Sequence, residues 1–318
     1  MKEHLSITVR RCVHGQDDAI RAELYNRVCA GEPDFVPQTV EDVRRRNDNP
    51  SEGKRHRFMA ELDGVPVGLA LTYADPDWPE KKGFIDGPGV VPEHRRKGVG
   101  TALARALMDD LRQQGMKQVD ISGPDCAATN AFCAKMGFAT VRSYSEMRRS
   151  LKDLPAEDSE PGPAVLESVE VTDEHLATLV SISQEAFKEY YDYRPWTLEG
   201  MKFHVATAAE QGNPRFLWFA RIAGLPVGYI WYGYGPKENA QLGRRTSLLM
   251  DLAVLKEHRN QGIAGALMIA GMAHLKSEGI EEATLYVDDM NSTGARHLYE
   301  RLGFSVIHRD LSHLKDLS

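Results

Sequence analysis

The sequence predicts an α/β (α+β) protein built from two tandem copies of one domain, each with a mixed central β-sheet flanked by helices. The stretch LKEHRNQGIAGAL (255–267) repeats the pattern of VPEHRRKGVGTAL (91–103), and IAGLPVGYIWYGY (222–234) repeats LDGVPVGLALTYA (62–74). The matching stretches follow the same order at a nearly constant offset, which indicates a duplicated domain. A chain of 318 residues also has the length of two ordinary domains.

A segment rich in proline, glycine and acidic residues marks the junction between the copies. The residues DLPAEDSEPGPAV (153–165) carry no apolar periodicity, so they are predicted to form a linker. We therefore expect an N-terminal domain over residues 1–154, a linker over 155–165 and a C-terminal domain over 166–318.

Each copy predicts the same order of elements. A short strand (6–11; 165–171) precedes a helical stretch, and a second helix follows with Thr39 or Thr197 at its N-cap. The PVG stretches predict hairpins that turn at Gly64 and Gly224. A strand, the repeated loop and a long helix come next, and a strand (118–122; 282–288), a short helix and a final strand (138–144; 304–310) complete the copy. This alternation predicts a mixed sheet covered by helices.

Composition and charge limit the classes of function. A net charge of −7 and a pI near 5.9 argue against a nucleic-acid partner. The N-terminus lacks an apolar signal region, and no apolar run reaches the length of about 18 residues that a membrane helix needs. We therefore expect a cytoplasmic protein, either monomer or homodimer, with no membrane partner. The four cysteines form no CxxC pair, so reduced thiols and no metal site are predicted.

The repeated loop has the composition of a phosphate-binding site. In both copies it lies between a predicted strand and a predicted helix, so its small residues (Gly98 and Gly100; Gly262 and Ala264) fall at a helix N-terminus. There the first backbone N–H groups have no partner within the helix, and small residues allow a phosphate to approach them. A dinucleotide fingerprint needs a third glycine where Leu103 stands, and no P-loop sequence occurs.

The loop and its surroundings resemble the GNAT superfamily of acyl-CoA-dependent N-acyltransferases, over nearly the whole of both copies. In that family an Arg/Gln-x-x-Gly-x-Gly/Ala loop binds the pyrophosphate of coenzyme A, and the end of the preceding strand separates from its neighbour to hold the acyl-pantetheine. An Asn and a Tyr four residues before a Gly-Phe pair follow, as in NSTGARHLYERLGF (291–304). The resemblance assigns acetyl-CoA contacts to Val90, Arg95, Arg96, Lys97, Gly98, Val99 and Gly100, and to Leu252, Ala253, Val254, Arg259, Asn260, Gln261, Gly262, Ile263, Ala264 and Asn291.

The same resemblance implies transfer of an acetyl group from acetyl-CoA to a primary amine by direct attack. Tyr299 would be the general acid that protonates the departing thiolate, and the backbone N–H of Val254 would face the thioester carbonyl. A phenol suits this role because its pKa, about 10, lies above the value of about 8.5 for a thiol. The sequence leaves open whether Asp251, Asp288 or Asp289 takes the proton of the ammonium.

The N-terminal copy departs from this pattern. Aligning Phe138 with Phe304 places Cys133 at the position of Tyr299 and Asp125 at that of Asn291. The pyrophosphate loop is retained while the acid is replaced. We therefore expect the N-terminal copy to bind coenzyme A without catalysis and the C-terminal copy to carry the chemistry.

The acceptor is expected beside an aromatic segment. Residues 187–200 of the C-terminal copy contain Tyr190, Tyr191, Tyr193 and Trp196, and in the family the two early helices of the domain wall the acceptor site. These aromatics suit a small-molecule amine, or they pack against the other copy. Two alternative functions remain open: a protein acetyltransferase acting on lysine or an N-terminus, and a non-catalytic acyl-CoA-binding regulatory protein.

Overall fold

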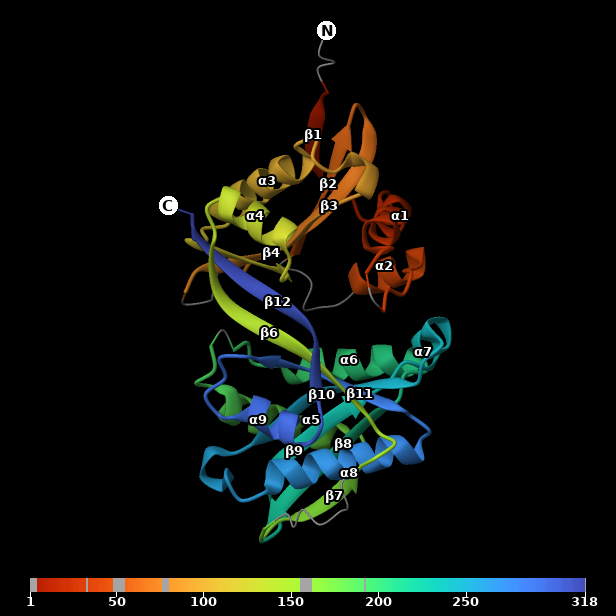
Figure 1. Cartoon of the computed structure of the whole chain (residues 1–318), viewed down its shortest axis with the longest axis vertical. Helices are drawn as coiled ribbons and strands as arrows, with labels where there is room; N and C mark the ends of the chain where they lie inside the picture. Colours follow the sequence, from red (N-terminus) through yellow and green to blue (C-terminus); the bar gives the residue numbers. More distant parts are fainter. Residues whose placement is uncertain are drawn as a thin grey trace. The chain divides into compact units, whose positions relative to one another are not determined.

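The computed structural model describes residues 5–32, 34–47, 55–75, 80–154, 162–191 and 193–317. The chain divides into two compact units (Figure 1). Unit 1 consists of Met1–Ser143 with Arg309–Ser318, and unit 2 consists of Tyr144–His308.

Unit 1 has a mixed sheet in the order β1-β2-β3-β4-β5-β12. Neighbouring strands are antiparallel except for the parallel pair β4 and β5. Its elements are β1 (Ile7–Arg11), α1 (Asp18–Cys29), α2 (Val40–Asn47), β2 (Arg55–Leu62), β3 (Val65–Tyr73), β4 (Lys82–Val90), the 3-10 turn η2 (Pro92–His94), α3 (Val99–Gln113), β5 (Gln118–Pro124), α4 (Ala127–Lys135) and the start of β6 (Ala139–Ser150).

Unit 2 repeats this architecture in the order β7-β8-β9-β10-β11-β6, again with one parallel pair, β10 and β11. The mixed sheet with flanking helices in both units confirms the predicted fold class. The elements are β7 (Val165–Val169), α5 (Asp173–Phe187), α6 (Leu198–Glu210), β8 (Arg215–Ile222), β9 (Leu225–Gly233), α7 (Pro236–Leu242), β10 (Thr246–Val254), the 3-10 turn η3 (Lys256–His258), α8 (Ile263–Ser277), β11 (Glu282–Asp288), α9 (Ala295–Arg301) and β12 (Ser305–Asp316).

The last strand of each sequence repeat completes the sheet of the other unit. Strand β12 pairs with β5, from Asp310 opposite Pro124 to Asp316 opposite Gln118. Strand β6 pairs with β11, from Tyr144 opposite Asp288 to Ser150 opposite Glu282. The compact units therefore differ from the sequence repeats expected at 1–154 and 166–318. Residues 155–161 of the expected linker lie outside the described residues.

Local sequence signals explain several element ends. Thr197 accepts a hydrogen bond from the Gly200 amide at 3.0 Å, and Thr39 accepts one from the Asp42 amide at 3.2 Å, so both predicted N-caps are confirmed. The predicted hairpins are also confirmed. At their tips, Gly64 and Gly224 have φ of 80° and 81°, a conformation that glycine adopts without steric cost.

Apolar side chains on both faces of the sheet of unit 2 form its core. Leu267, Met272 and Leu275 of α8 are fully buried on one face. On the other face α5 and α6 pack through Leu179 and Met201. This second layer lies directly against the part of β10 that enters the candidate site described below.

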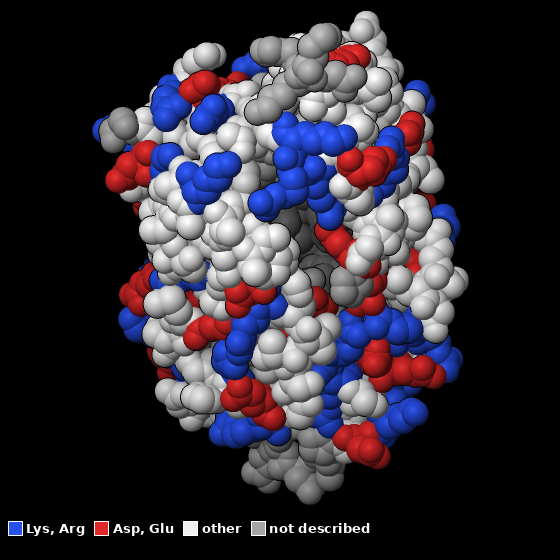
Figure 2. Space-filling model, turned by 45° about the horizontal axis from the view of Figure 1, so that its top comes forward, with Lys and Arg blue, Asp and Glu red and all other residues white. Residues whose placement is uncertain are grey.

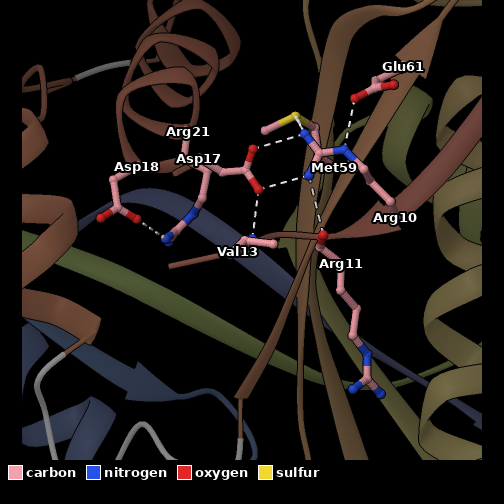
Figure 3. Close-up of polar contacts among 8 residues, drawn as sticks. All are labelled: Arg10, Arg11, Val13, Asp17, Asp18, Arg21, Met59 and Glu61. Carbon is pink, nitrogen blue, oxygen red and sulfur yellow. Dashed lines mark hydrogen bonds and ion pairs between the residues drawn. The ribbon is translucent and has the colours of Figure 1, made fainter. Parts of the chain in front are cut away.

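In unit 1, ion pairs connect the start of α1 to strand β1 (Figure 3). Arg10 donates two hydrogen bonds to Asp17, at 2.8 and 2.9 Å, and a third to Glu61 at 2.9 Å. The Arg10 guanidinium lowers the pKa of Asp17 to about 2. Arg21 faces the buried Asp18 at 3.4 Å. The first turn of α1 therefore depends on charged partners.

Charges of both signs are interspersed on the face drawn in Figure 2, with one group of lysine and arginine side chains in its upper half. Within the described part of the chain, no helix has the length and apolar character needed to cross a membrane. Nor do the described residues contain a group of three or more metal-ligating side chains.

Candidate active site

Parallel strands separate in the middle of each sheet. Strands β10 and β11 pair only from Thr246–Leu248 to Glu282–Thr284, although β10 continues to Val254. In unit 1, β4 and β5 pair from Lys82 to Ile85 only, although β4 continues to Val90. Each sheet thus has a wedge-shaped opening between its two parallel strands, called the wedge below. The strand edges that line it carry backbone groups available to bind a ligand.

The backbone N–H of Val254 points into the wedge of unit 2. The next amide, that of Leu255, donates to the Val227 carbonyl at 2.9 Å and so faces strand β9. Because successive amides of a strand point to opposite edges, the Val254 amide faces the separated edge. The amide of Val91 in unit 1 likewise donates to Val67, at 3.0 Å, which turns the Val90 amide toward the wedge.

The repeated loop has the same backbone in both units. After the 3-10 turn, Arg96 and Asn260 adopt φ of 63° and 60°. Gly98 and Gly262, with φ of 91° and 81°, are the N-caps of α3 and α8. The helical bonds begin with Ala102 to Gly98 and Ala266 to Gly262, each at 3.0 Å. The amides before these positions have no partner within the helix, which makes each loop a suitable site for an anion.

The loop arginines hold the loop to the fold. Arg259 donates from Nε to the Val254 carbonyl at 3.0 Å and from Nη2 to the Ala186 carbonyl at 2.8 Å. Arg95 makes the matching bonds to Val90 at 2.9 Å and to Val28 at 3.4 Å. These arginines therefore connect the end of the strand to the last turn of the first helix of the unit. Their side chains have a structural role that the sequence pattern did not indicate.

A β-bulge directs Asp251 toward α5. The register of β10 against β9 shifts between Leu249 and Asp251, and the extra residue at such a bulge turns the following side chain to the other face. Leu249 belongs to the core under α8, whereas Ala253 packs in the layer under α5 and α6. Asp251 lies on the same side as Ala253, where the Tyr229 hydroxyl donates to its Oδ2 at 2.5 Å.

Asp251 and Tyr299 lie close enough to interact. Burial raises the pKa of Asp251 to about 6, while the hydrogen bond from Tyr229 opposes this change. Burial, together with the nearby charges of Asp251 and Tyr190, raises the pKa of Tyr299. No hydrogen-bond partner of the Tyr299 hydroxyl occurs among the residues that the structure describes. The site therefore pairs a carboxyl that titrates near neutral pH with a phenol that keeps its proton.

The other two carboxylates considered as bases have structural partners. Asp288 accepts from the Met290 amide at 2.9 Å in the turn after β11. Asp289 accepts from the Ser145 hydroxyl at 2.7 Å and from Arg296 at 2.6 Å. Of the three candidates, Asp251 is the one whose charge acts on the Tyr299 hydroxyl.

Aromatic residues after α5 form a wall beside this pair. The side-chain Nδ2 of Asn291 donates to the Tyr190 hydroxyl at 3.0 Å, which joins this segment to the loop after β11. The hydroxyl oxygens of Tyr193 and Ser183 lie 3.2 Å apart. The charge of Asp251 also raises the pKa of Tyr193. Of the four predicted aromatics, Tyr190 and Tyr193 lie at the site.

The other two predicted aromatics, Tyr191 and Trp196, are 39% and 41% exposed. Tyr229 and Ser183 did not stand out in the sequence. The one available signal was that Tyr229 replaces Leu69 of the first copy.

Unit 1 has no tyrosine at the position of Tyr299. Cys133, at the position of Tyr299, is 1% exposed, and burial raises the pKa of its thiol to about 11. Counting back from the loop arginine places Gly87 at the sequence position of Asp251, whereas in the strand register Asp86 lies opposite Leu71 as Asp251 lies opposite Trp231. Asp125 accepts from the Asn130 side chain at 3.0 Å. The wedge and the loop are thus present in both units, whereas the tyrosine at position 299 and the Tyr229–Asp251 hydrogen bond occur in unit 2.

Comparison with known proteins agrees with this geometry. The profile of the acetyltransferase (GNAT) family matches residues 22–138 and 176–304. A mycothiol acetyltransferase of Thermomonospora curvata is 31% identical over 258 residues, covering 80% of each chain. A mycothiol acetyltransferase of Actinosynnema mirum is 28% identical and covers 92% of this chain and 95% of its own. A solved tandem GNAT protein of the clavulanic acid biosynthesis pathway has a TM-score of 0.76 at 17% identity, over 98% of this chain and 99% of its own.

Two mixed sheets, each with separating strands beside a glycine-containing loop, define a tandem acyl-CoA-binding fold. The chain belongs to the GNAT acetyltransferase family and is an acyl-CoA-dependent N-acetyltransferase. Members of this family use acetyl-CoA as the acyl donor.

Proposed function

We propose that unit 2 transfers an acetyl group from acetyl-CoA to the primary amine of a small molecule. The observation that carries the proposal is the placement of Asp251 and Tyr299 beside the wedge between β10 and β11. The loop amides of Asn260–Ala264 would bind the pyrophosphate, aided by a helix dipole equivalent to about half a positive charge. Leu252–Val254 would hold the pantetheine arm, with the Val254 N–H directed at the thioester oxygen.

In the proposed reaction, two side chains of unit 2 move protons. Asp251, whose pKa is about 6, accepts a proton from the acceptor ammonium at neutral pH. The free amine attacks the thioester carbon, forming a C–N bond, while the Val254 N–H stabilises the oxyanion. The C–S bond then breaks, and Tyr299 gives its proton to the departing thiolate. The nitrogen, which carries a positive charge after the attack, gives its second proton through solvent to the Tyr299 phenolate. Asp251 releases the first proton to solvent, so both side chains return to their starting states.

Unit 1 would bind coenzyme A and carry out no transfer. Its loop and wedge match those of unit 2, whereas Cys133 is enclosed in the core and carries a raised pKa. Within the sequence, this division separates an N-terminal repeat over 1–154 from a catalytic C-terminal repeat over 166–318. The arrangement resembles that of mycothiol synthase, and the mycothiol acetyltransferases among the relatives make a mycothiol-related amine the first acceptor to assay.

Thiol release from acetyl-CoA with a panel of amines tests the proposal. The panel should contain mycothiol-related amines, simple alkylamines and lysine-containing peptides. Acetylation of a small amine supports the proposal, whereas acetylation of peptides alone would indicate a protein acetyltransferase. Binding of coenzyme A without turnover of any acceptor would indicate a regulatory protein.

A further inference from the structure

Tyr229 is a fully buried tyrosine whose hydroxyl contacts the candidate base. It lies on β9 with its side chain in the layer under α5 and α6. Its hydroxyl donates to Oδ2 of Asp251, on the adjacent strand, at 2.5 Å. A buried hydroxyl requires a partner, and this bond restricts the rotation of the Asp251 carboxylate. A carboxylate can accept several hydrogen bonds, so it retains acceptor sites for an amine or a water.

The titratable groups that interact with the charge of Asp251 are tyrosines from three separate elements. Tyr229 comes from β9, Tyr193 from the segment after α5, and Tyr299 from α9. Among the described residues, no lysine, arginine or histidine contributes to the electrostatics of the Asp251 carboxyl. The hydrogen bond from Tyr229 is therefore the main side-chain interaction that favours its ionised form.

The pair is specific to the unit that carries Tyr299. In unit 1 the position of Tyr229 is taken by Leu69, which has no hydroxyl, although Asp86 lies opposite Leu71 as Asp251 lies opposite Trp231. Tyr232, on the same strand of unit 2, is equally buried but belongs to the core under α8. Burial of a tyrosine on β9 thus does not by itself require a carboxylate partner.

We propose that Tyr229 is a positioning residue that holds the Asp251 carboxylate in the orientation and charge state that accept the proton of the acceptor ammonium. This inference rests on the proposed function of unit 2. Asp251 contacts the acceptor, whereas Tyr229 acts through Asp251. Removing the hydroxyl removes an interaction that lowers the pKa of Asp251, so the base becomes harder to ionise.

The pH dependence of kcat/KM in Tyr229→Phe tests the role of this hydroxyl. The base must be ionised, so activity falls as the pH decreases through the pKa of Asp251. We expect the acid limb of the variant to move upward by about one pH unit, giving about tenfold lower kcat/KM below the limb and a much smaller loss above it. Tyr232→Phe removes a hydroxyl of equal burial on the same strand and should leave the limb in place. A loss in Tyr229→Phe that is equal at every pH would overturn the proposal.

A second measurement separates this inference from the proposed function. Carbon-13 NMR of the full-length protein with labelled aspartate reports the titration of the Asp251 carboxyl without any acceptor, and Asp251→Asn identifies its signal. We expect Tyr229→Phe to raise that pKa by about one unit while Tyr232→Phe does not. An unchanged pKa overturns the role of Tyr229 even if the enzyme is active. A raised pKa in a protein that acetylates no amine retains the Tyr229–Asp251 coupling but refutes the proposed reaction and, with it, the positioning role.

Discussion

Replacing Tyr299 by phenylalanine should slow acetyl transfer while leaving the binding of acetyl-CoA intact. The Tyr299 hydroxyl is the proposed proton donor, and its raised pKa keeps it protonated at neutral pH. Without it, a thiolate whose conjugate acid has a pKa of about 8.5 must leave unprotonated or take a proton from water. General acids contribute about 10²- to 10⁴-fold. A thiolate is a fair leaving group, so we expect the lower end, about 10²-fold in kcat or about 2.7 kcal/mol.

The assay is thiol release from acetyl-CoA at saturating amine. The KM for acetyl-CoA should change by less than about twofold, because an interaction made only in the transition state affects kcat. Cys133→Ala is the matched control, since it alters the equivalent position of unit 1 and should leave kcat unchanged. Full activity in Tyr299→Phe together with a loss in Cys133→Ala would refute both the acid and its assignment to unit 2.

Three further predictions concern the base, the exchanged strand and the ion pairs of unit 1. Asp251→Asn should lower kcat/KM at pH 7 by about 10²-fold or more, with unchanged coenzyme A affinity by calorimetry; near-normal turnover would show that another group is the base. A chain ending at His308 loses the part of β12 that pairs with β5 and the buried Leu317. Hydrogen exchange should show loss of protection at the β5 amides that face β12, and retained protection there would contradict the strand exchange. Asp17 has its pKa lowered to about 2, so it stabilises the folded state by about 1 kcal/mol after allowance for the exposed Arg10. This stabilisation is complete above pH ~4 and is lost as the pH falls toward 2. Asp17→Asn should remove that part of the acid sensitivity in thermal unfolding, and an unchanged profile would count against the ion pair.

The local parts of the fold were predictable because their signals lie within a few residues. The N-cap at Thr197 and the hairpin turn at Gly224 each depend on a neighbouring backbone group. The loop before α8 was predictable for the same reason. Its glycine and alanine stand where a helix begins, and the same pattern recurs in unit 1.

Strand exchange was not predictable from the repeats. Both copies end in a similar strand, and either strand satisfies the apolar pattern of either sheet. The choice depends on pairings such as Leu314 opposite Asp120 and Met147 opposite Leu285, which join residues far apart in the sequence. The pattern therefore gave the number and order of strands but not the partner of the last one.

The candidate site was partly predictable. Tyr299 followed from its spacing to Gly303 and Phe304, which is a local feature. The role of Asp251 depends on a bulge that turns its side chain and on Tyr229 from the adjacent strand, neither of which leaves a pattern in the sequence. The use of Arg259 to bind the carbonyls of Val254 and Ala186 depends on the packing of α5 against the loop.

Matched changes in the two loops test most directly which unit carries the chemistry. Gly262 and Gly98 both have a positive φ and the same place at a helix N-terminus, so Gly262→Val and Gly98→Val should cost similar stability, about 1–3 kcal/mol. Each adds a side chain where the loop amides must approach phosphate. We predict that Gly262→Val abolishes coenzyme A release from acetyl-CoA while Gly98→Val, folded to the same extent, retains the rate of the unaltered protein. Activity lost in Gly98→Val and kept in Gly262→Val would contradict the assignment of the chemistry to unit 2.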